Sequence, residues 1–170
     1  IARKQNNCIY DGEVIYISDN ADVIINEGSI KNGYSMNGAG GIHIKYNATV
    51  VLNNVNIVEN IADGSDGAGI AVYDGSVLVM NGGSISDNAM LSTKPYHYSY
   101  GLLYVNNATA TLNNVTISNN RSEGVNSEGV AIYADDSTVT LNDCVVSGNG
   151  TKELGEYSES IIAGYSSTIN

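Results

Sequence analysis

The sequence predicts an all-β fold, a right-handed parallel β-helix of about five to six coils with three short strands in each coil. The first observation behind this prediction is an asparagine that returns at spacings of 27, 28, 32, 29 and 28 residues, at Asn26, Asn53, Asn81, Asn113, Asn142 and Asn170. The second is that apolar residues alternate around each of these asparagines, which is the period of a strand. A period of this length indicates stacked repeats whose coils cover one another.

The first two strands of each repeat are predicted to meet at this asparagine. In the second repeat, Val50 and Leu52 precede Asn53 at alternate positions, and Val55 and Ile57 follow it two and four residues later. Because the side chains of a strand alternate between its two faces, we expect these four residues to point into the coil. The residues between them are polar or suited to turns, so we expect them to face outward.

A second asparagine follows the first by seven residues, at Asn60, Asn88, Asn120 and Asn149. Amide side chains at the same turn of successive coils can pass hydrogen bonds from coil to coil. We therefore predict a structural ladder rather than a catalytic role for these residues, and the same role for Asn53, Asn81, Asn113 and Asn142.

The third strand is predicted near the next repeat glycine, which is Gly40, Gly69, Gly101 or Gly129. The segment before that glycine is the variable part of the repeat, and three of these segments are expected to be the loops 61–68, 121–128 and 150–159. Loops of a regular scaffold commonly carry binding residues. The longest loop follows Asn88 and holds the densest aromatic cluster of the chain.

Aromatic rings beside polar groups suit sugars, whose apolar faces stack while their hydroxyls form hydrogen bonds. The predicted ligand-binding residues on this acidic and aromatic edge are Tyr96, His97, Tyr98, Tyr100, Asp63, Asp66, Glu123 and Tyr157. The alternative is a solvated loop whose tyrosines only cover apolar surface.

Two further rows of side chains are predicted along the stack. Tyr73, Tyr104 and Tyr133 follow repeat glycines and are expected to stack with Tyr16, Tyr46 and Tyr165, in a structural role. The pair Thr109 and Thr111 should lie beside Thr138 and Thr140 on the next coil. Such threonine pairs are typical of ice-binding β-helices, but only two coils carry them.

Short motifs add a family resemblance. The chain has Gly-Gly-Ile at 40–42, Gly-Ala-Gly-Ile at 67–70, and Ile-x-x-Asn at 57–60, 85–88 and 117–120. These motifs resemble the paired repeats of chlamydial polymorphic membrane proteins and of adhesin-like surface proteins, within the pectin-lyase-like β-helices. The resemblance covers residues 12–170 and implies a secreted or surface-displayed segment that acts in adhesion, at an extracellular or cell-surface location.

Composition limits the possible partners. The 170 residues include 18 acidic and seven basic ones, for a formal net charge of −11, which disfavours nucleic acid. No stretch approaches 18 apolar residues, so this segment is not expected to insert into a membrane. We expect residues 1–170 to form a single solenoid that is a piece of a longer repeat protein. Several coils separate Cys8 from Cys144, too far for a disulfide, and Cys144 is expected in the core.

Catalysis is not predicted. Polysaccharide lyases need a base, often Arg or Lys, beside a calcium site, and hydrolases need paired carboxylates. Arg121 has no row of aspartates beside it, Asp135-Asp136 fits a turn, and His43 has no metal-ligand neighbour in the sequence. No cofactor or metal is expected, although the sequence Asp-Gly-Ser-Asp-Gly at 63–67 could hold calcium weakly.

The predicted function is that of an adhesin segment that binds a host or environmental glycan, or a host-surface protein, through loops on one edge. The alternative is a structural stalk or a self-assembling extracellular filament, because exposed terminal coils are open sheet edges that favour end-to-end association. A polysaccharide lyase or hydrolase is the less favoured alternative.

Overall fold

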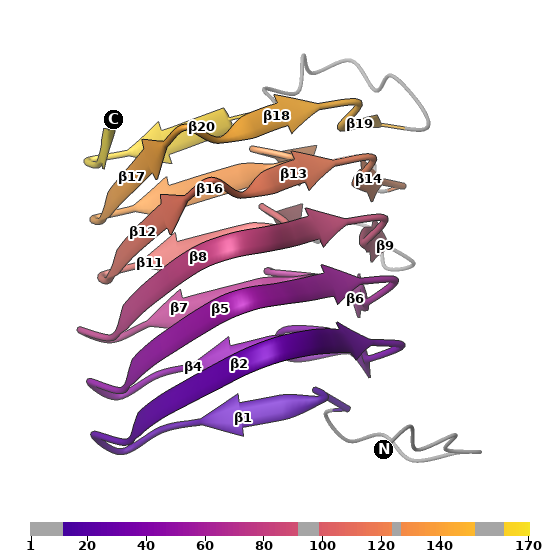
Figure 1. Ribbon diagram of the computed structural model, residues 1–170. Helices are drawn as coiled ribbons and strands as arrows, with labels where there is room; N and C mark the ends of the chain where they lie inside the picture. Colours follow the sequence, from indigo (N-terminus) through magenta and orange to yellow (C-terminus); the bar gives the residue numbers. More distant parts are fainter. Residues whose placement is uncertain (1–11, 92–98, 124–126, 152–161) are drawn as a thin grey trace.

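The computed structural model describes residues 12–91, 99–123, 127–151 and 162–170. These residues form one stack of β-coils, and every strand pairs in parallel with strands of neighbouring coils (Figure 1). Each coil contributes to three sheets, so the predicted all-β parallel solenoid is confirmed. No helix occurs among the described residues, and thus none of them forms a helix able to cross a membrane.

Sheet A holds one strand from each of six levels of the stack. Its strands are β1 (Ile15–Ile17), β4 (Ile42–Ile44), β7 (Ile70–Tyr73), β11 (Leu103–Asn106), β16 (Ile132–Asp135) and β20 (Ile162–Tyr165). These strands begin just after the repeat glycines, where a strand was predicted.

Sheet B is the widest face and carries the repeating asparagines. Its strands are β2 (Asp22–Lys31), β5 (Thr49–Val58), β8 (Val77–Ser86), β12 (Thr109–Asn113), β13 (Thr116–Ser118), β17 (Thr138–Asn142), β18 (Val145–Ser147) and β21 (Thr168–Ile169).

Sheet C closes the coil between sheets B and A. Its strands are β3 (Tyr34–Ser35), β6 (Ile61–Asp63), β9 (Ala89–Leu91), β14 (Arg121–Ser122) and β19 (Gly150–Thr151), and a separate pair joins β10 (Ser99–Tyr100) to β15 (Ser127–Glu128). The sequence prediction missed this sheet because strands of two or three residues show no periodicity. The expected loops 61–68, 121–128 and 150–159 therefore begin later than predicted.

The two strands predicted to meet at the repeat asparagine belong to one sheet. In the first three coils they are a single ten-residue strand, and in the next two they are separate strands of sheet B. The residue after each of these asparagines has a positive φ and also faces outward, so two consecutive outward residues stand between the inward residues on either side. These residues are Glu27, Asn54, Gly82, Asn114 and Asp143. Val50, Leu52, Val55 and Ile57 are consequently all fully buried, as predicted.

The asparagine ladders are present. In the inner ladder, which runs through Asn60, Asn88, Asn120 and Asn149, each Oδ1 accepts the backbone N–H and the Nδ2 of the asparagine one coil below, at 2.9–3.0 Å. Gly33 replaces the asparagine in the first coil, and its N–H donates to Asn60 Oδ1. The outer ladder joins the repeat asparagines of sheet B by Nδ2–Oδ1 bonds of 2.7–2.8 Å.

The core fills the space between sheets A and B with aliphatic side chains, and a smaller cluster that includes Met90 and Leu102 lies beside sheet C. Cys144 packs against the main core at the position that Val55 and Val115 fill in other coils. It is partly rather than fully buried, since the structure shows β18 paired only with β13. Cys8 lies outside the described residues.

Candidate functional site

A stack of aromatic rings lies on the outer face of sheet A. It runs through Tyr16, His43, Tyr73, Tyr104 and Tyr133, with ring centroids separated by 5.4, 5.2, 5.3 and 5.8 Å in that order. Aromatic pairs at these separations stabilise the structure beyond the area that they bury. The stack is therefore continuous over five coils, as the sequence partly predicted.

The register of the stack differs from the prediction at Tyr73. The residue of β7 in register with Tyr104 is Ala71, and Tyr73 is in register with Asn106. The small side chain of Ala71 leaves space, and the Tyr73 ring packs there between His43 and Tyr104. The spacing Ala-x-Tyr allows this arrangement but does not determine it, because it recurs at Ala163 and Tyr165, whose ring is exposed.

Two tyrosines predicted for the stack lie elsewhere. Tyr46 is exposed in the turn after β4, with a positive φ, and the Lys45 ammonium lies 4.8 Å from its ring centroid and 5.1 Å from that of Tyr16. Tyr165 is in register with Asp135, next to the row of the stack, and is 67% exposed. Tyr46 lies beyond the end of its strand. Tyr165 follows Ala163, which is in register with Tyr133 as Ala71 is with Tyr104, yet its ring stays exposed.

Tyr100, which comes shortly before strand β11 of sheet A, packs its ring against this stack. Its ring centroid lies 4.5 Å from that of Tyr133 and 6.3 Å from that of Tyr104. Its backbone N–H donates to Asp66 Oδ1 at 2.9 Å. Two predicted ligand-binding residues, Asp66 and Tyr100, are thus held together beside the aromatic stack. We call Asp66, Tyr73, Tyr100 and Tyr104 the Asp66 cluster.

The carboxyl group of Asp66 is unusual for an acidic surface loop. Burial raises its pKa to about 6, although the hydrogen bond from the Tyr100 backbone acts in the opposite direction. Burial, followed by the nearby Asp66 charge, raises the pKa of both Tyr73 and Tyr104 above the ordinary phenol value. Both phenols therefore stay protonated at neutral pH and can donate hydrogen bonds, while Asp66 can accept them.

A hydrogen-bonded pair of side chains adjoins the lower end of the stack. His43 Nδ1 lies 3.0 Å from Glu13 Oε1, and both side chains are nearly buried. A Cβ at Gly38 would approach these two side chains within 2.8 Å, so a larger residue there would displace the pair. The sequence indicated no partner for His43 because Glu13 lies 30 residues earlier in the chain, and only the stacking of the coils brings them together.

The other described candidates lie on sheet C, away from this cluster. The Tyr34 hydroxyl donates to Asp63 Oδ2 at 2.7 Å, and this bond, with burial, raises the pKa of Tyr34 to about 12. Glu123 Oε1 accepts from Arg121 Nε at 2.7 Å. Sheet C therefore orders these acidic side chains with partners from its own strands. The predicted residues Tyr96, His97, Tyr98 and Tyr157 lie outside the described residues.

The two aspartates of the segment 63–67 interact with different groups. Asp63 accepts the Tyr34 hydroxyl, and Asp66 accepts the Tyr100 backbone N–H. Within the described ranges, no three His, Cys, Asp or Glu side chains gather as a metal site would require. The arrangement at Asp66 can bind hydroxyl or ammonium groups through one carboxylate and neighbouring phenols.

Comparison with known proteins identifies the architecture. A family model described as the right-handed beta helix region matches residues 3–170, which is nearly the whole chain. No curated protein matches the chain. No solved structure matches it either.

Proposed function

The chain belongs to the right-handed β-helix family, and from that premise we propose that it is a segment of a surface or secreted adhesin that binds glycans at the Asp66 cluster. The family's fold supports both enzymes and non-enzymatic proteins, so the proposal depends on the local chemistry of the site. The adhesin-like repeats that the sequence resembles agree with this function.

The observation that carries the proposal is the partly buried carboxyl group of Asp66. Its pKa of about 6 means that burial of its charge costs stability at neutral pH. Titratable groups with strongly shifted pKa values are concentrated at functional sites. Beside Asp66, the phenols of Tyr73 and Tyr104 remain donors, and Tyr100 adds aromatic surface. Carboxylate, phenol and aromatic groups together are the chemistry that recognises sugar hydroxyls and ring faces.

The charge of the chain favours neutral or cationic sugars. Eighteen acidic residues against seven basic ones repel uronic acids, sulfated glycans and sialylated glycans. At the site itself, the two influences on the Asp66 carboxyl group from the part of the chain that the structure describes are burial and the Tyr100 backbone N–H, and neither is a cation that would attract an anionic sugar. Neutral oligosaccharides and those that contain amino sugars are therefore the expected ligands.

The test is retention of the purified chain on a panel of soluble neutral, cationic and anionic oligosaccharides. The variant Asp66→Asn keeps an acceptor for the Tyr100 N–H but removes the charge, so we expect it to stay folded and to bind about tenfold more weakly. The matched control is Tyr46→Ala, which removes an exposed tyrosine from a turn outside the cluster.

Two results would overturn the proposal. The first is retention that is equal for the wild type and for Asp66→Asn. The second is the appearance of new reducing or unsaturated ends during incubation, which would assign the chain to the polysaccharide hydrolases or lyases instead.

A further inference from the structure

The outer face of sheet B carries a single charged residue, Asp143, from the second coil to the fifth. The outward positions of β5, β8, β12, β13, β17 and β18, with the residue that follows each repeat asparagine, are Thr, Val, Asn, Ser or Gly except for Asp143: Thr49, Val51, Asn53, Asn54, Asn56, Val58, Val77, Val79, Asn81, Gly82, Ser84, Ser86, Thr109, Thr111, Asn113, Asn114, Thr116, Ser118, Thr138, Thr140, Asn142, Asp143, Val145 and Ser147. In a chain of net charge −11, this is a distinct surface, which we call the sheet B face.

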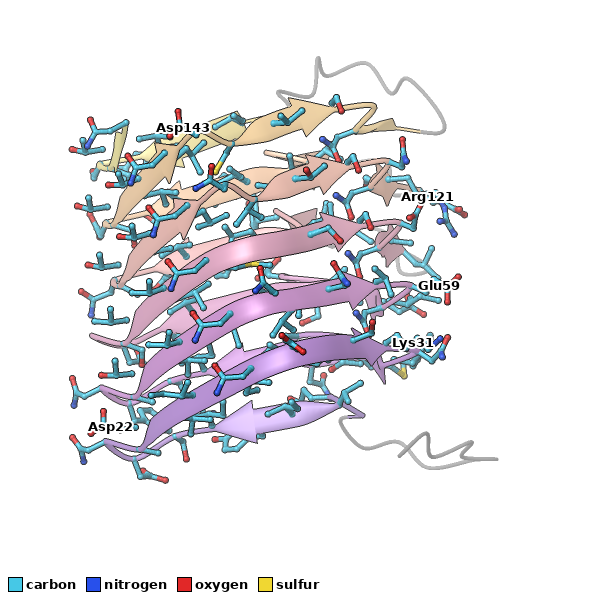
Figure 2. The ribbon with its side chains drawn as sticks, viewed as in Figure 1. Asp22, Lys31, Glu59, Arg121 and Asp143 are labelled. Atoms are coloured by element: carbon cyan, nitrogen blue, oxygen red, sulfur yellow. The ribbon has the colours of Figure 1, made fainter. Side chains whose placement is uncertain are left out.

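Charged side chains lie around the margin of this face. Figure 2 shows Asp22 and Lys31 on β2, the lowest strand of sheet B, and Glu59 and Arg121 at the side of sheet C. Asp143 lies on an upper coil, between β17 and β18. The opposite turns add exposed aspartates at 74 and 136. The margin is mainly acidic, and within the face Asp143 on the fifth coil is the one charged residue.

The sheet B face is also rigid and periodic. Its strands are in parallel register, so Thr109 lies beside Thr138 and Thr111 beside Thr140, as the sequence predicted. The outer ladder fixes the asparagine amides along the stack, and Ser84 Oγ donates to Asn56 Oδ1 at 3.0 Å. The same kinds of side chain therefore recur at each coil, about 4.8 Å apart. A preordered surface loses little conformational entropy on binding.

Size and charge disfavour a second copy of the chain as the partner. Ten residues along a strand and four coils give an area of roughly 600 Å², from about 3.3 Å per residue and 4.8 Å per strand. A stable protein interface buries about 800 Å² on each partner. Two copies face to face would in addition bring their acidic margins together, which is unfavourable.

We propose that the sheet B face binds the flat surface of an ordered, uncharged polysaccharide whose extended chains lie side by side. A polymer repeats along its length, so each coil can make the same contacts. Asparagine, serine and threonine groups can bond its hydroxyls, and the methyl groups of valine and threonine can contact its apolar ring faces. This surface is separate from the Asp66 cluster, since sheet B lies in front of sheet A in Figure 1.

The experiment is a binding isotherm of the chain on suspended microcrystalline cellulose and on particulate chitin. The double variant Val79→Lys/Thr111→Lys places two long cations at the centre of the face. We expect it to reduce the association constant by about tenfold or more. The matched control is Tyr165→Lys, an exposed position on sheet A. It should bind as the wild type does, and circular dichroism and the thermal midpoint establish that each variant is folded.

A second variant, Thr140→Lys, lies one coil higher and should also weaken binding. The proposal is overturned if neither polysaccharide retains the wild type, or if the variants on the face bind as well as Tyr165→Lys. It is also overturned if the variants abolish a concentration-dependent dimer, which would assign the face to self-association, or if the chain inhibits ice recrystallisation without binding either polymer. Loss of soluble-glycan binding at Asp66 leaves this proposal unaffected.

Discussion

Replacement of Asn88 by alanine should destabilise the coil far more than the same replacement in the outer ladder. Asn88 is fully buried, and its Oδ1 accepts the N–H and the Nδ2 of Asn60, both at 3.0 Å. Its Nδ2 lies 2.9 Å from Ile57 O and 3.0 Å from Asn120 Oδ1. The variant removes these bonds from a site that water does not reach.

The magnitude follows from the groups left without these partners. Asn60 N–H and Ile57 C=O each lose a bond from the Asn88 side chain, and a buried polar group left unsatisfied costs about 1–3 kcal/mol. The free energy of unfolding of Asn88→Ala should therefore fall by about 4 kcal/mol, for two such groups. The matched control Asn81→Ala also loses two amide bonds, but at a half-buried position where water can replace them. Its loss should be about 1 kcal/mol.

The assay is equilibrium unfolding in urea, followed by circular dichroism and by tyrosine fluorescence. Coincident transitions with the two probes establish that a single free energy describes unfolding. Equal losses for Asn88→Ala and Asn81→Ala would refute the reasoning, because they would show that burial of the inner ladder does not determine its contribution.

Three further results are expected. The pKa of Asp66 is about 6 in the folded chain and has the ordinary aspartate value of 3.8 in the unfolded chain. Between these two pH values Asp66 holds its proton mainly in the folded state. Its contribution to stability is therefore fully present below pH 3.8 and is lost as the pH rises through about 6. Asp66→Asn should remove this loss, so its free energy of unfolding at pH 7, measured by urea titration, should exceed that of the wild type by up to about 3 kcal/mol. An unchanged free energy of unfolding at pH 7 would contradict the burial of the Asp66 carboxyl group. Tyr73→Ala should open a void between His43 and Tyr104 and lower the free energy of unfolding by about 2–3 kcal/mol, whereas Tyr165→Ala, at an exposed position, should change it little in the same titrations. Asp63→Asn should lower the pKa of Tyr34 from about 12 toward 10 in an ultraviolet titration, since the hydrogen bond to Asp63 is the main cause of the shift; an unchanged phenol pKa would show that the bond is not responsible.

The sequence could predict the parts of the fold that repeat. The spacing of the asparagines and the alternation around Asn53 predicted the coil and the buried positions Val50, Leu52, Val55 and Ile57. The sheet C strands escaped prediction because two or three residues are too few to show a period. The two strands predicted to meet at the repeat asparagine lie in one sheet, because a single residue of positive φ lets the inward and outward alternation continue beyond the asparagine without ending the sheet.

The site was predictable only where its residues lie in the variable segment. Asp66 and Tyr100 were identified from their acidic and aromatic setting, but their direct contact depends on how successive coils stack. The Glu13–His43 pair could not be predicted, since Glu13 precedes the first repeat asparagine and no local spacing links it to His43. The burial that raises the Asp66 pKa likewise comes from tertiary packing, which periodicity does not describe.

The most direct test of the central claim is the pKa of Asp66 with and without a bound glycan, measured by carbon NMR of the side-chain carboxyl group. The ligand is the soluble oligosaccharide that the panel retains most strongly, at saturating concentration. If its hydroxyl or ammonium groups bind the carboxylate, they favour the charged form, and the pKa must fall below its value of about 6. A glycan that saturates the chain while the Asp66 pKa stays unchanged would show that the Asp66 cluster is not the binding site.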